Sequence, residues 1–445
     1  MGLRTVMKVC FVSLGCDKNL VDTEKMLALL AEAGYELTDD DRSADVCVIN
    51  TCCFIHDAMQ ESINTILEYG RMKKSGSLKG LIVTGCLAQR YKEDIIRQIP
   101  EVDAVVGTFA CGEIVHVIDS LGLTGQVLAD TDGYSSPGSH RIRSSFNHYS
   151  FLKIAEGCDK YCTYCIIPYI RGHYRSYPME DLVEEAASLA ASGVNELILV
   201  AQETTLYGTD LYGRRCLPEL VHRICSVDGI DMVRLMYCYP EEIDDEFISM
   251  YINEPKLCNY IDMPIQHISD RILRLMGRRT DGKQIRSIID RLRSSVPDIA
   301  IRTSLITGFP GETEEDQKEL LSFIDEYRLD RVGVFTYSRE EGTPASKMNG
   351  QVHHSTRKRR QREVMERQQK VVFEKNASFV GKEFRCIVDG RLEDDDVYVG
   401  RTYMDAPDID GCVFFESNRE LMSGSLADVR ISGYQGYDLS GIMIN

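Results

Sequence analysis

The sequence predicts an α/β fold in three parts: an N-terminal doubly wound parallel sheet (1–147), a central partial (β/α)6 barrel with a connecting helix (148–376) and a small C-terminal β-barrel (377–445). Three observations predict it. Apolar runs near the N-terminus each precede a helix-length segment, six more runs alternate with helices, and the last segment has short strands between Gly-rich turns. At 445 residues the chain is long enough for two or three domains of roughly 150 residues.

The N-terminal part repeats a strand–loop–helix unit in which each strand ends at a cysteine. Apolar runs end at Cys16, Cys52 and Cys86, and helix-length segments follow at about 20–33, 56–74 and 90–98. In a doubly wound sheet the loops at the carboxyl ends of the strands converge on one crevice. We therefore expect these three thiols to meet in space and to offer a three-thiolate metal site.

The other cysteines have no such shared position. Free cysteines are favoured in protein cores, and nine are expected there: Cys10, Cys47, Cys111, Cys216, Cys225, Cys238, Cys258, Cys386 and Cys412. Cys53 stays open as a core neighbour or a substitute ligand, since it adjoins Cys52. We favour Cys52, because its place at the strand end matches those of Cys16 and Cys86.

The central part alternates strands and helices and carries polar groups after its strands. The strands are expected at 151–155, 196–201, 232–237, 259–264, 299–306 and 331–337, with helices such as 179–192 and 313–327. In a parallel barrel the loops after the strands carry the reactive groups. These loops hold Gln202 and Glu203, Gln266 and His267, and the turn from Gly308 to Gly311 and Glu312.

Three cysteines follow the first barrel strand at a C-x3-C-x2-C spacing: Cys158, Cys162 and Cys165. A [4Fe–4S] cluster normally takes four thiolates, so a local set of three leaves one iron free to bind a ligand. Zinc is the alternative, but a zinc ribbon needs a second Cys or His pair about 15 to 20 residues on. His173 is the only candidate in that interval and stands alone, so the spacing favours the cluster.

The chain ends with a basic stretch and an acidic module. Residues 357–370 carry seven basic and two acidic residues at helix-forming composition, which favours a connecting helix docked on an acidic protein over an RNA contact. Residues 377–445, with strands expected at 384–388, 397–401 and 412–415, hold thirteen Asp or Glu against six Lys or Arg, a net charge of −7. Acidic residues near Asp394, Asp395, Asp396, Asp408 and Asp410 are the candidate docking surface.

The composition limits the class of protein. The formal net charge of −18 repels nucleic-acid phosphates unless a basic patch is segregated. No apolar run approaches the ~20 residues of a membrane span. Sixteen cysteines at irregular spacings, without a recognisable signal sequence, favour metal or redox use in a reducing compartment over a disulfide framework. A cytoplasmic protein is expected.

With two three-cysteine sets ahead of a small C-terminal barrel, the whole chain resembles the methylthiotransferase family of radical S-adenosylmethionine (SAM) enzymes. The resemblance implies an N-terminal methylthiotransferase domain, a radical SAM barrel and a C-terminal TRAM domain. Three segments look like the branch called RimO: 164–176 (YCIIPYIRGHYRS), 202–208 (QETTLYG) and 408–413 (DIDGCV). Two positions depart from its pattern, Glu203 where Asp is usual and Tyr177 where Arg often follows.

The resemblance implies the cofactors and the reaction. Cys158, Cys162 and Cys165 would hold the cluster that cleaves SAM, and Cys16, Cys52 and Cys86 an auxiliary [4Fe–4S] cluster. Contacts to SAM are expected from Tyr164, which matches the aromatic position of the motif, and from Gln202, Glu203, Gln266, Gly308 and Gly311. The implied reaction adds a methylthio group to the β-carbon of an aspartate in small-subunit ribosomal protein twelve, with a reductant such as flavodoxin or ferredoxin and a sulfur donor.

Two other functions stay open. One is a tRNA methylthiotransferase of the same family that acts on an adenosine beside the anticodon. The acidic C-terminal module argues against it, because an RNA-binding module pairs Lys and Arg with phosphates. The other is a non-catalytic iron–sulfur or zinc scaffold on the ribosome, which metal content and a SAM-cleavage assay would distinguish.

Overall fold

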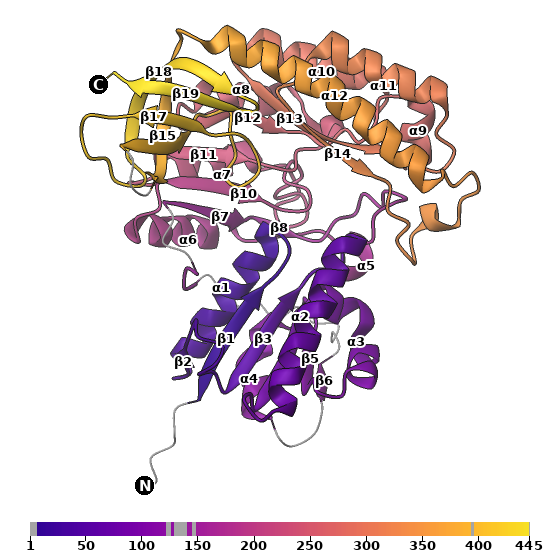
Figure 1. Cartoon of the computed structure of the whole chain (residues 1–445), viewed down its shortest axis with the longest axis vertical. Helices are drawn as coiled ribbons and strands as arrows, with labels where there is room; N and C mark the ends of the chain where they lie inside the picture. Colours follow the sequence, from indigo (N-terminus) through magenta and orange to yellow (C-terminus); the bar gives the residue numbers. More distant parts are fainter. Residues whose placement is uncertain (1–6, 122–125, 129–139, 145–147, 393–395, 445) are drawn as a thin grey trace. The chain divides into compact units, whose positions relative to one another are not determined.

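The computed structural model describes residues 7–121, 126–128, 140–144, 148–392 and 396–444 (Figure 1). Two compact units make up the chain. The first holds residues 1–146 together with 156–159 and 165–174, and the second holds 147–155, 160–164 and 175–445. Among the described helices, none combines the length and apolar character that crossing a bilayer requires. The three-domain boundaries at 147 and 376 stay a prediction.

A six-stranded parallel sheet, in the order β2-β1-β3-β4-β5-β6, forms the centre of the first unit. Helices cover both faces. Buried residues of α1 and α4 pack on one face, and those of α2 and α3 pack on the other. The elements are β1 (Lys8–Ser13), α1 (Asp17–Glu32), β2 (Glu36–Leu37), β3 (Val46–Thr51), α2 (His56–Lys74), β4 (Gly80–Gly85), α3 (Cys86–Gln98), β5 (Ala104–Val106), η1 (Cys111–Glu113), α4 (Ile114–Asp119), β6 (Gln126–Leu128) and α5 (Ile167–Arg171).

This sheet is the predicted doubly wound one, with two differences. β2, β5 and β6 are only two or three residues long and were not expected, because so short an apolar run gives no periodic pattern. The helix expected over 90–98 already begins at Cys86 and kinks at Lys92. The expected core cysteines of this unit, Cys10, Cys47 and Cys111, are buried.

Six parallel strands in the order β14-β13-β12-β11-β10-β7 form the main sheet of the second unit, as the sequence predicts. Their bounds are β7 (Tyr149–Lys153), β10 (Glu196–Val200), β11 (Met232–Leu235), β12 (Leu257–Asp262), β13 (Ala300–Thr307) and β14 (Arg331–Thr336). Around them run α6 (Met179–Ala191), α7 (Leu217–Cys225), η2 (Pro240–Glu242), α8 (Asp245–Asn253), α9 (Asp270–Leu275), α10 (Gly282–Ser295), α11 (Glu314–Tyr327) and η3 (Pro344–Lys347). β8 (Ala155–Glu156) and β9 (Arg175–Ser176) are short.

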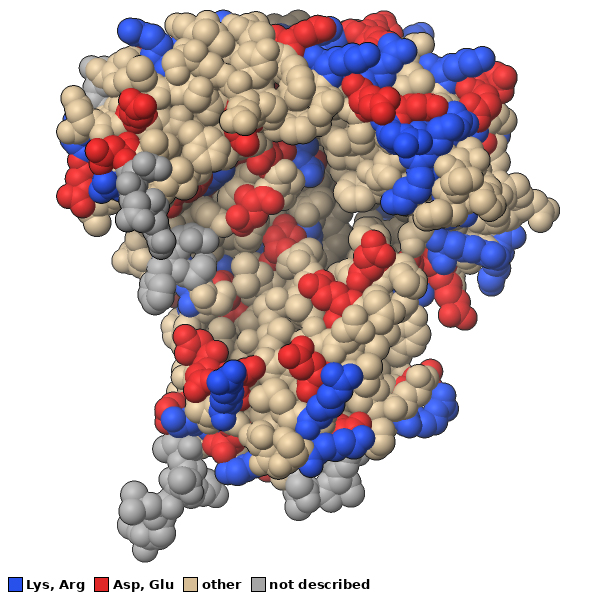
Figure 2. Space-filling view, viewed as in Figure 1, with Lys and Arg blue, Asp and Glu red and all other residues tan. Residues whose placement is uncertain are grey.

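The basic stretch lies in α12 (His354–Phe379), a long helix that docks on α11 and β14. Arg359 pairs with Glu314 and Glu363, and Arg360 is buried with Nη1 2.9 Å from Glu312 Oε1. Figure 2 shows Lys and Arg interspersed with Asp and Glu over this part of the surface. The docked connecting helix is therefore confirmed, since carboxylates of the same unit neutralise much of its positive charge.

A closed five-stranded barrel ends the chain, with the strand order β15-β16-β17-β19-β18. The strands are β15 (Glu383–Arg391), β16 (Val397–Arg401), β17 (Val413–Glu416), β18 (Leu426–Gln435) and β19 (Asp438–Met443). Alternate residues such as Cys386, Val388, Val429 and Ile431 fill its interior. The last two strands were not expected, because their glycines and polar residues dilute the alternation of side chains.

The loop between β16 and β17 packs under the six-stranded sheet. Met404 and Ala406 join a buried cluster with residues of β10, β12 and β13. At the amino-terminal end of the strands, Glu196 Oε2 accepts a hydrogen bond from Arg401 Nη2 at 2.7 Å, and Arg331 Nη2 lies 2.5 Å from Asp405 Oδ1. Apolar packing and buried ion pairs thus close this end of the sheet.

This packing corrects part of the expected docking surface. The side chain of Asp410 is 4% exposed, accepts a hydrogen bond from the hydroxyl of Tyr260 at 2.9 Å and pairs with Arg302, so its carboxylate is not available for docking. Asp408 and Asp396 are exposed, although each already has a partner in Tyr149 or Arg391. Asp394 and Asp395 lie outside the described residues.

Glu196→Gln tests how much the closed end of the sheet depends on this charge. Glu196 is fully buried between Arg234 and Arg401, so the substitution leaves two buried guanidinium groups without their shared carboxylate. Breaking a buried pair in this way costs about 3 kcal/mol. Chemical unfolding followed by far-ultraviolet circular dichroism should show that loss. Glu383→Gln in the exposed Glu383–Arg430 pair is the matched control and should cost less than ~1 kcal/mol. Equal effects of the two substitutions would contradict the argument.

Candidate functional site

Cys16, Cys52 and Cys86 lie at the carboxyl ends of three neighbouring strands. Cys16 follows β1 and caps α1, Cys52 follows β3, and Cys86 opens α3 directly after β4. The chain leaves β1 toward β2 on one side and returns to β3 on the other, so β1 and β3 flank the point where the strand order reverses. Open α/β sheets bind their ligands at such a point.

The three thiols influence one another electrostatically. Burial raises the pKa of Cys86 to about 12, and the charges of Cys16 and Cys52 add to the increase. Burial is also the main cause of the raised pKa of Cys52, and the charge of Cys16 again contributes. Cys16 is exposed, whereas the other two are buried. Cys86 Sγ lies 3.8 Å from Asn19 Oδ1, at the side chain that also contacts the backbone next to Cys52. The three residues thus lie at one edge of the sheet, and their role as a ligand set stays a prediction.

Glycines permit this close approach. Gly15 has φ +98°, and a Cβ at that position would lie 2.6 Å from the Cβ of Cys52. Gly85 has φ +90°, and a Cβ there would lie 2.3 Å from Asn50 Oδ1. Each glycine directly precedes a cysteine of the set, although Gly-Cys pairs also occur at 157–158 and 411–412, so the pair is only a weak sequence signal.

Cys53, the alternative ligand, is buried beside this set. Its side chain is fully buried in the core cluster with Ile66 and Leu87, and burial raises its pKa to about 12. The charges of Cys86 and Cys52 contribute to that increase, and the charge of Arg90 opposes it. Because Cys86 lies in the same cluster with a similarly raised pKa, burial does not separate Cys53 from the predicted ligands, and the preference for Cys52 stays a prediction.

Sequence reasoning missed two polar residues beside these thiols, Asn19 and Arg171. Asn19 Nδ2 donates to Leu14 O at 3.0 Å and to Thr51 O at 2.9 Å, so its amide ties together the loops that lead to Cys16 and Cys52. Arg171 Nη2 donates to Asn19 Oδ1 and lies 3.4 Å from Cys86 Sγ. Arg171 stands in the 164–176 segment, but its spacing from the cysteines gave no signal of this contact.

Of the second cysteine set, Cys158 and Cys165 lie in the first unit and Cys162 in the second. Cys158 N donates to Gly172 O at 3.1 Å, and Gly157 has φ +78° with no room for a Cβ beside His173 O. Cys162 Sγ is 3.9 Å from Arg278 Nη1. Cys158 and Cys162 are buried, and Cys165 is half-buried.

The donor chemistry of both sets fits iron–sulfur clusters. Each set offers three thiols, and within a [4Fe–4S] cluster each thiolate binds a different iron. A zinc site requires four ligands around a single ion. His173, the candidate fourth ligand, is exposed and its Nδ1 lies 2.8 Å from Asp159 Oδ1. Among the described residues, those of the two cysteine sets included, no three Cys, His, Asp or Glu side chains are grouped as the ligands of a single metal ion.

Buried charges gather at the carboxyl end of the sheet in the second unit. Lys160 Nζ lies 2.5 Å from Glu242 Oε1, 3.4 Å from Glu241 Oε1 and 3.6 Å from Glu203 Oε2. Glu203 Oε1 accepts hydrogen bonds from Thr205, and Oε2 has no hydrogen-bond partner. Burial raises the pKa of Glu203 to about 7, against the opposing charge of Lys160. Glu203 Oε2 thus accepts no hydrogen bond, and Lys160 Nζ at 3.6 Å is the cation that it faces.

Of the remaining residues expected at SAM, Gln266, Gly308 and Gly311 have positive φ, whereas Gln202, half-buried after β10, and Tyr164 do not. Gln266 has φ +70° and exchanges backbone hydrogen bonds with β13, and Tyr164 contacts Phe309 edge to face. A Cβ on Gly308 would lie 2.3 Å from the Cγ of Arg357, so packing of α12 already requires this glycine. Gly311 has φ +82° and donates from its N to Gly350 O at 2.8 Å. His267 is buried, and its burial lowers its pKa to about 4.

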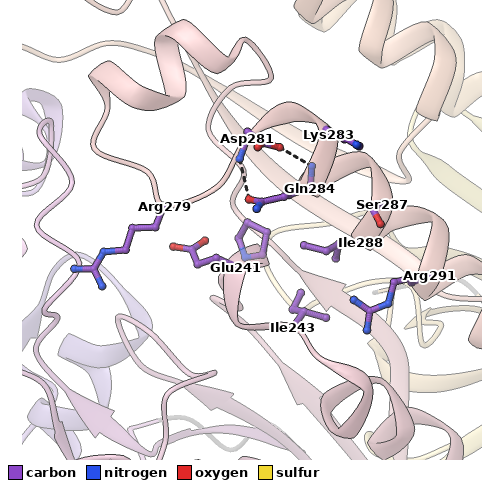
Figure 3. A pocket seen from close by; sticks show the side chains of 10 residues that line it. Glu241, Ile243, Arg279, Asp281, Lys283, Gln284, Ser287, Ile288 and Arg291 are labelled. Carbon is purple, nitrogen blue, oxygen red and sulfur yellow. Dashed lines mark hydrogen bonds between the residues drawn. The ribbon is translucent and has the colours of Figure 1, made fainter.

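A cavity of about 570 Å³ adjoins this charge cluster (Figure 3). Its lining combines Glu241 on η2 with Arg279 before α10 and with Lys283 and Arg291 on that helix. In Figure 3, Ile243 and Ile288 lie between the charged side chains of Glu241 and Arg291. Because Glu241 also contacts Lys160, it belongs to both the cavity wall and the buried cluster.

The raised pKa of Glu203 predicts a pH dependence of stability. As pH rises from 4.5 to about 7, an unfolded glutamate ionises while the folded one keeps its proton, so this group's stabilising contribution is lost over that window. Glu203→Gln should remove the loss. The free energy of unfolding of this variant relative to the parent should therefore increase across the window and level off above it. Chemical unfolding at a series of pH values measures it, with exposed Glu246→Gln on α8 as control. Parallel curves for the parent and Glu203→Gln would contradict the raised pKa.

Three family models match the chain. Residues 8–107 match the uncharacterized protein family UPF0004, residues 152–324 the radical SAM superfamily, and residues 380–444 the TRAM domain. Among solved structures, the radical SAM methyltransferase TsrM from Kitasatospora setae has a TM-score of 0.56 at 14% identity over 77% of each chain. The cobalamin-dependent radical enzyme OxsB has a TM-score of 0.55 at 14% identity over 77% of this chain and 55% of its own. At this identity the likeness shows the fold alone.

Curated relatives match over nearly the full length. The ribosomal protein uS12 methylthiotransferase RimO of Lachnoclostridium phytofermentans is 56% identical over 98% of this chain and 99% of its own. The protein of that name from Acetivibrio thermocellus is 49% identical over 98% of both chains. With this identity over the whole chain, and with cysteine loops of the expected donor chemistry, the protein belongs to the RimO family of radical SAM methylthiotransferases.

Proposed function

We propose that this protein adds a methylthio group to the β-carbon of one aspartate in the small-subunit ribosomal protein uS12. The observation that carries the proposal is the 56% and 49% identity, over 98% of the chain, to proteins named for that reaction. The two three-thiol sets support it, because the reaction needs both a radical and a source of sulfur.

The proposed cofactors are two [4Fe–4S] clusters and SAM. Cys158, Cys162 and Cys165 are assigned to the cluster that binds SAM, and Cys16, Cys52 and Cys86 to the auxiliary cluster. When bound, these groups supply the one-electron chemistry and the sulfur that an unactivated C–H bond requires. The protein contributes the thiolates, the orientation of the cofactors and the exclusion of water.

Residues at the carboxyl end of the second unit's sheet are assigned to SAM binding. The ligand set is Tyr164, Gln202, Glu203, Gln266, Gly308 and Gly311. Glu203 has the strongest structural support, because its buried Oε2 lacks a hydrogen-bond partner and suits the ammonium group of an amino acid. Gly308 has the weakest, since its contact with Arg357 explains the glycine without a ligand.

Charge supports a basic protein substrate. The C-terminal segment 377–445 has a net charge of −7, which suits a basic ribosomal protein and repels a tRNA backbone. Asp396 and Asp408 remain the exposed candidates for this contact. We also propose a reductant such as flavodoxin or ferredoxin, a separate sulfur donor and, from the ribosomal substrate, a cytoplasmic location.

The substrate assignment is tested by anaerobic turnover with purified uS12 and, in parallel, with tRNA. We expect uS12 alone to gain the mass of one methylthio group in place of a hydrogen, located at an aspartate by peptide mass spectrometry. Raised salt should weaken the binding of uS12, because opposed surface charges are screened. Modification of tRNA with uS12 left unchanged would establish the tRNA enzyme instead.

The roles of the two cysteine sets are tested by two triple variants after anaerobic reconstitution. Two clusters predict about eight iron atoms per chain, and either triple Cys→Ala variant should retain about four. The variant at Cys158, Cys162 and Cys165 should lose SAM cleavage. The variant at Cys16, Cys52 and Cys86 should still release 5′-deoxyadenosine but transfer no sulfur.

Folding of each triple variant is checked by circular dichroism. If SAM cleavage disappeared in a folded auxiliary-set variant that retains four irons, the two sets would not be independent. Tightly bound zinc in place of iron would contradict the cluster assignment altogether.

A further inference from the structure

We propose that Arg171 is a positioning residue for the auxiliary cluster: its guanidinium donates a hydrogen bond to the sulfur of Cys86 and raises the reduction potential of the cluster held there. The inference rests on the proposed function, because it takes Cys86 as a cluster ligand. It adds a residue whose contact is with the ligand's sulfur and not with the substrate.

The guanidinium of Arg171 has a fixed orientation. Its side chain is 1% exposed, and Nη1 donates to Asp22 Oδ2 at 2.8 Å and to Glu156 Oε2 at 3.1 Å. Nη2 donates to Asn19 Oδ1 and lies 3.4 Å from Cys86 Sγ. Because three oxygen acceptors hold the planar group from two sides, the N–H directed at sulfur is held in place before any cluster binds.

The sign of the effect follows from charge. A cluster with thiolate ligands gains a further negative charge on reduction, and hydrogen bonds to its sulfurs stabilise the reduced state. Arginine stays protonated at every physiological pH, so this donor and its positive charge are permanent. Asp22 and Glu156 offset part of that charge but leave the hydrogen bond to sulfur.

Arg171 also connects the two cysteine sets along the chain. It ends α5, six residues after Cys165, and α5 packs in the first unit through Ile166 and Ile170 and through a 2.9 Å hydrogen bond from Thr108 Oγ1 to Ile170 O. Arg171 is also hydrogen-bonded to Asn19, whose side-chain amide ties the loops before Cys16 and Cys52. One short segment thus carries a ligand of the first cluster and the donor to a ligand of the second.

The test measures the midpoint potential of the auxiliary cluster by an electron paramagnetic resonance titration. The full-length chain carries Cys158→Ala, Cys162→Ala and Cys165→Ala, so that only the auxiliary cluster contributes. Arg171→Met removes the charge and the donors, and the potential should shift to a more negative value. Arg171→Lys keeps the positive charge, but an ammonium group cannot make all four contacts of the planar guanidinium. The potential of this variant should therefore shift less than that of Arg171→Met.

Arg234→Met is the matched control. Arg234 is also fully buried and pairs with a carboxylate, Glu196, but it lies in the second unit. Its substitution should lower stability and leave the potential unchanged. Arg171→Met could bind no iron and still keep the unfolding transition of the parent. Loss of the cluster from a folded chain would then support the positioning role, and the midpoint potential would be measured on Arg171→Lys instead.

Two results would overturn the proposal. In one, both Arg171 variants titrate at the potential of the parent. In the other, the iron content of both variants falls only in proportion to the fraction of folded protein, as expected if Arg171 only stabilises the fold through its ion pairs. If the parent background itself bound no iron, the assignment of Cys16, Cys52 and Cys86 in the proposed function would be wrong, and this proposal would be wrong with it. An intact cluster with an unshifted potential overturns the Arg171 proposal alone.

Discussion

The carboxyl ends of parallel strands lie at one edge of their sheet, and both candidate sites of this chain depend on that constraint. In the first unit it collects cysteines that are more than thirty residues apart in sequence, and Asn19 then holds two of the loops at a fixed separation. In the second unit the same edge collects Lys160, Glu203, Glu241 and Glu242. Neither arrangement needs residues that are neighbours in sequence, because the sheet supplies the proximity.

The opposite edge of the second unit's sheet has a structural role. There the loop after β16 inserts Met404 and Ala406 under the strands and surrounds them with ion pairs such as Arg331 with Asp405. Buried ion pairs contribute little net stability, but removing one partner is costly, so they specify a single arrangement of the two β-structures. Closing one end in this way leaves the loops at the carboxyl end as the place for ligands.

The sequence was sufficient for the large elements and for the family, whereas the cysteine ligand sets stay a prediction. Buried strands such as β3 and β4 are continuous apolar runs, and the three-cysteine spacing has a specific chemical meaning. It was insufficient for β5 and β6, which are three residues long, and for Asp410, whose acidic character suggested a surface. The side chain of Asp410 is buried because Arg302 and Tyr260 meet it there, and these partners are more than a hundred residues away. Periodicity carries no information about such tertiary partners.

Glycines show the same limit in another form. Gly308 fits a ligand-binding turn by sequence, but the structure shows Arg357 where its side chain would be. Gly15 and Gly85, which no prediction used, are the glycines that leave room for the cysteine loops. A glycine after a strand therefore indicates close approach of another group, but only the fold identifies that group as a ligand, a side chain or a second loop. A following cysteine does not settle that identity either, because Gly85-Cys86 leads to a predicted ligand, whereas Gly411-Cys412 leads to a cysteine expected in the core and makes its close approach to the backbone of Tyr437.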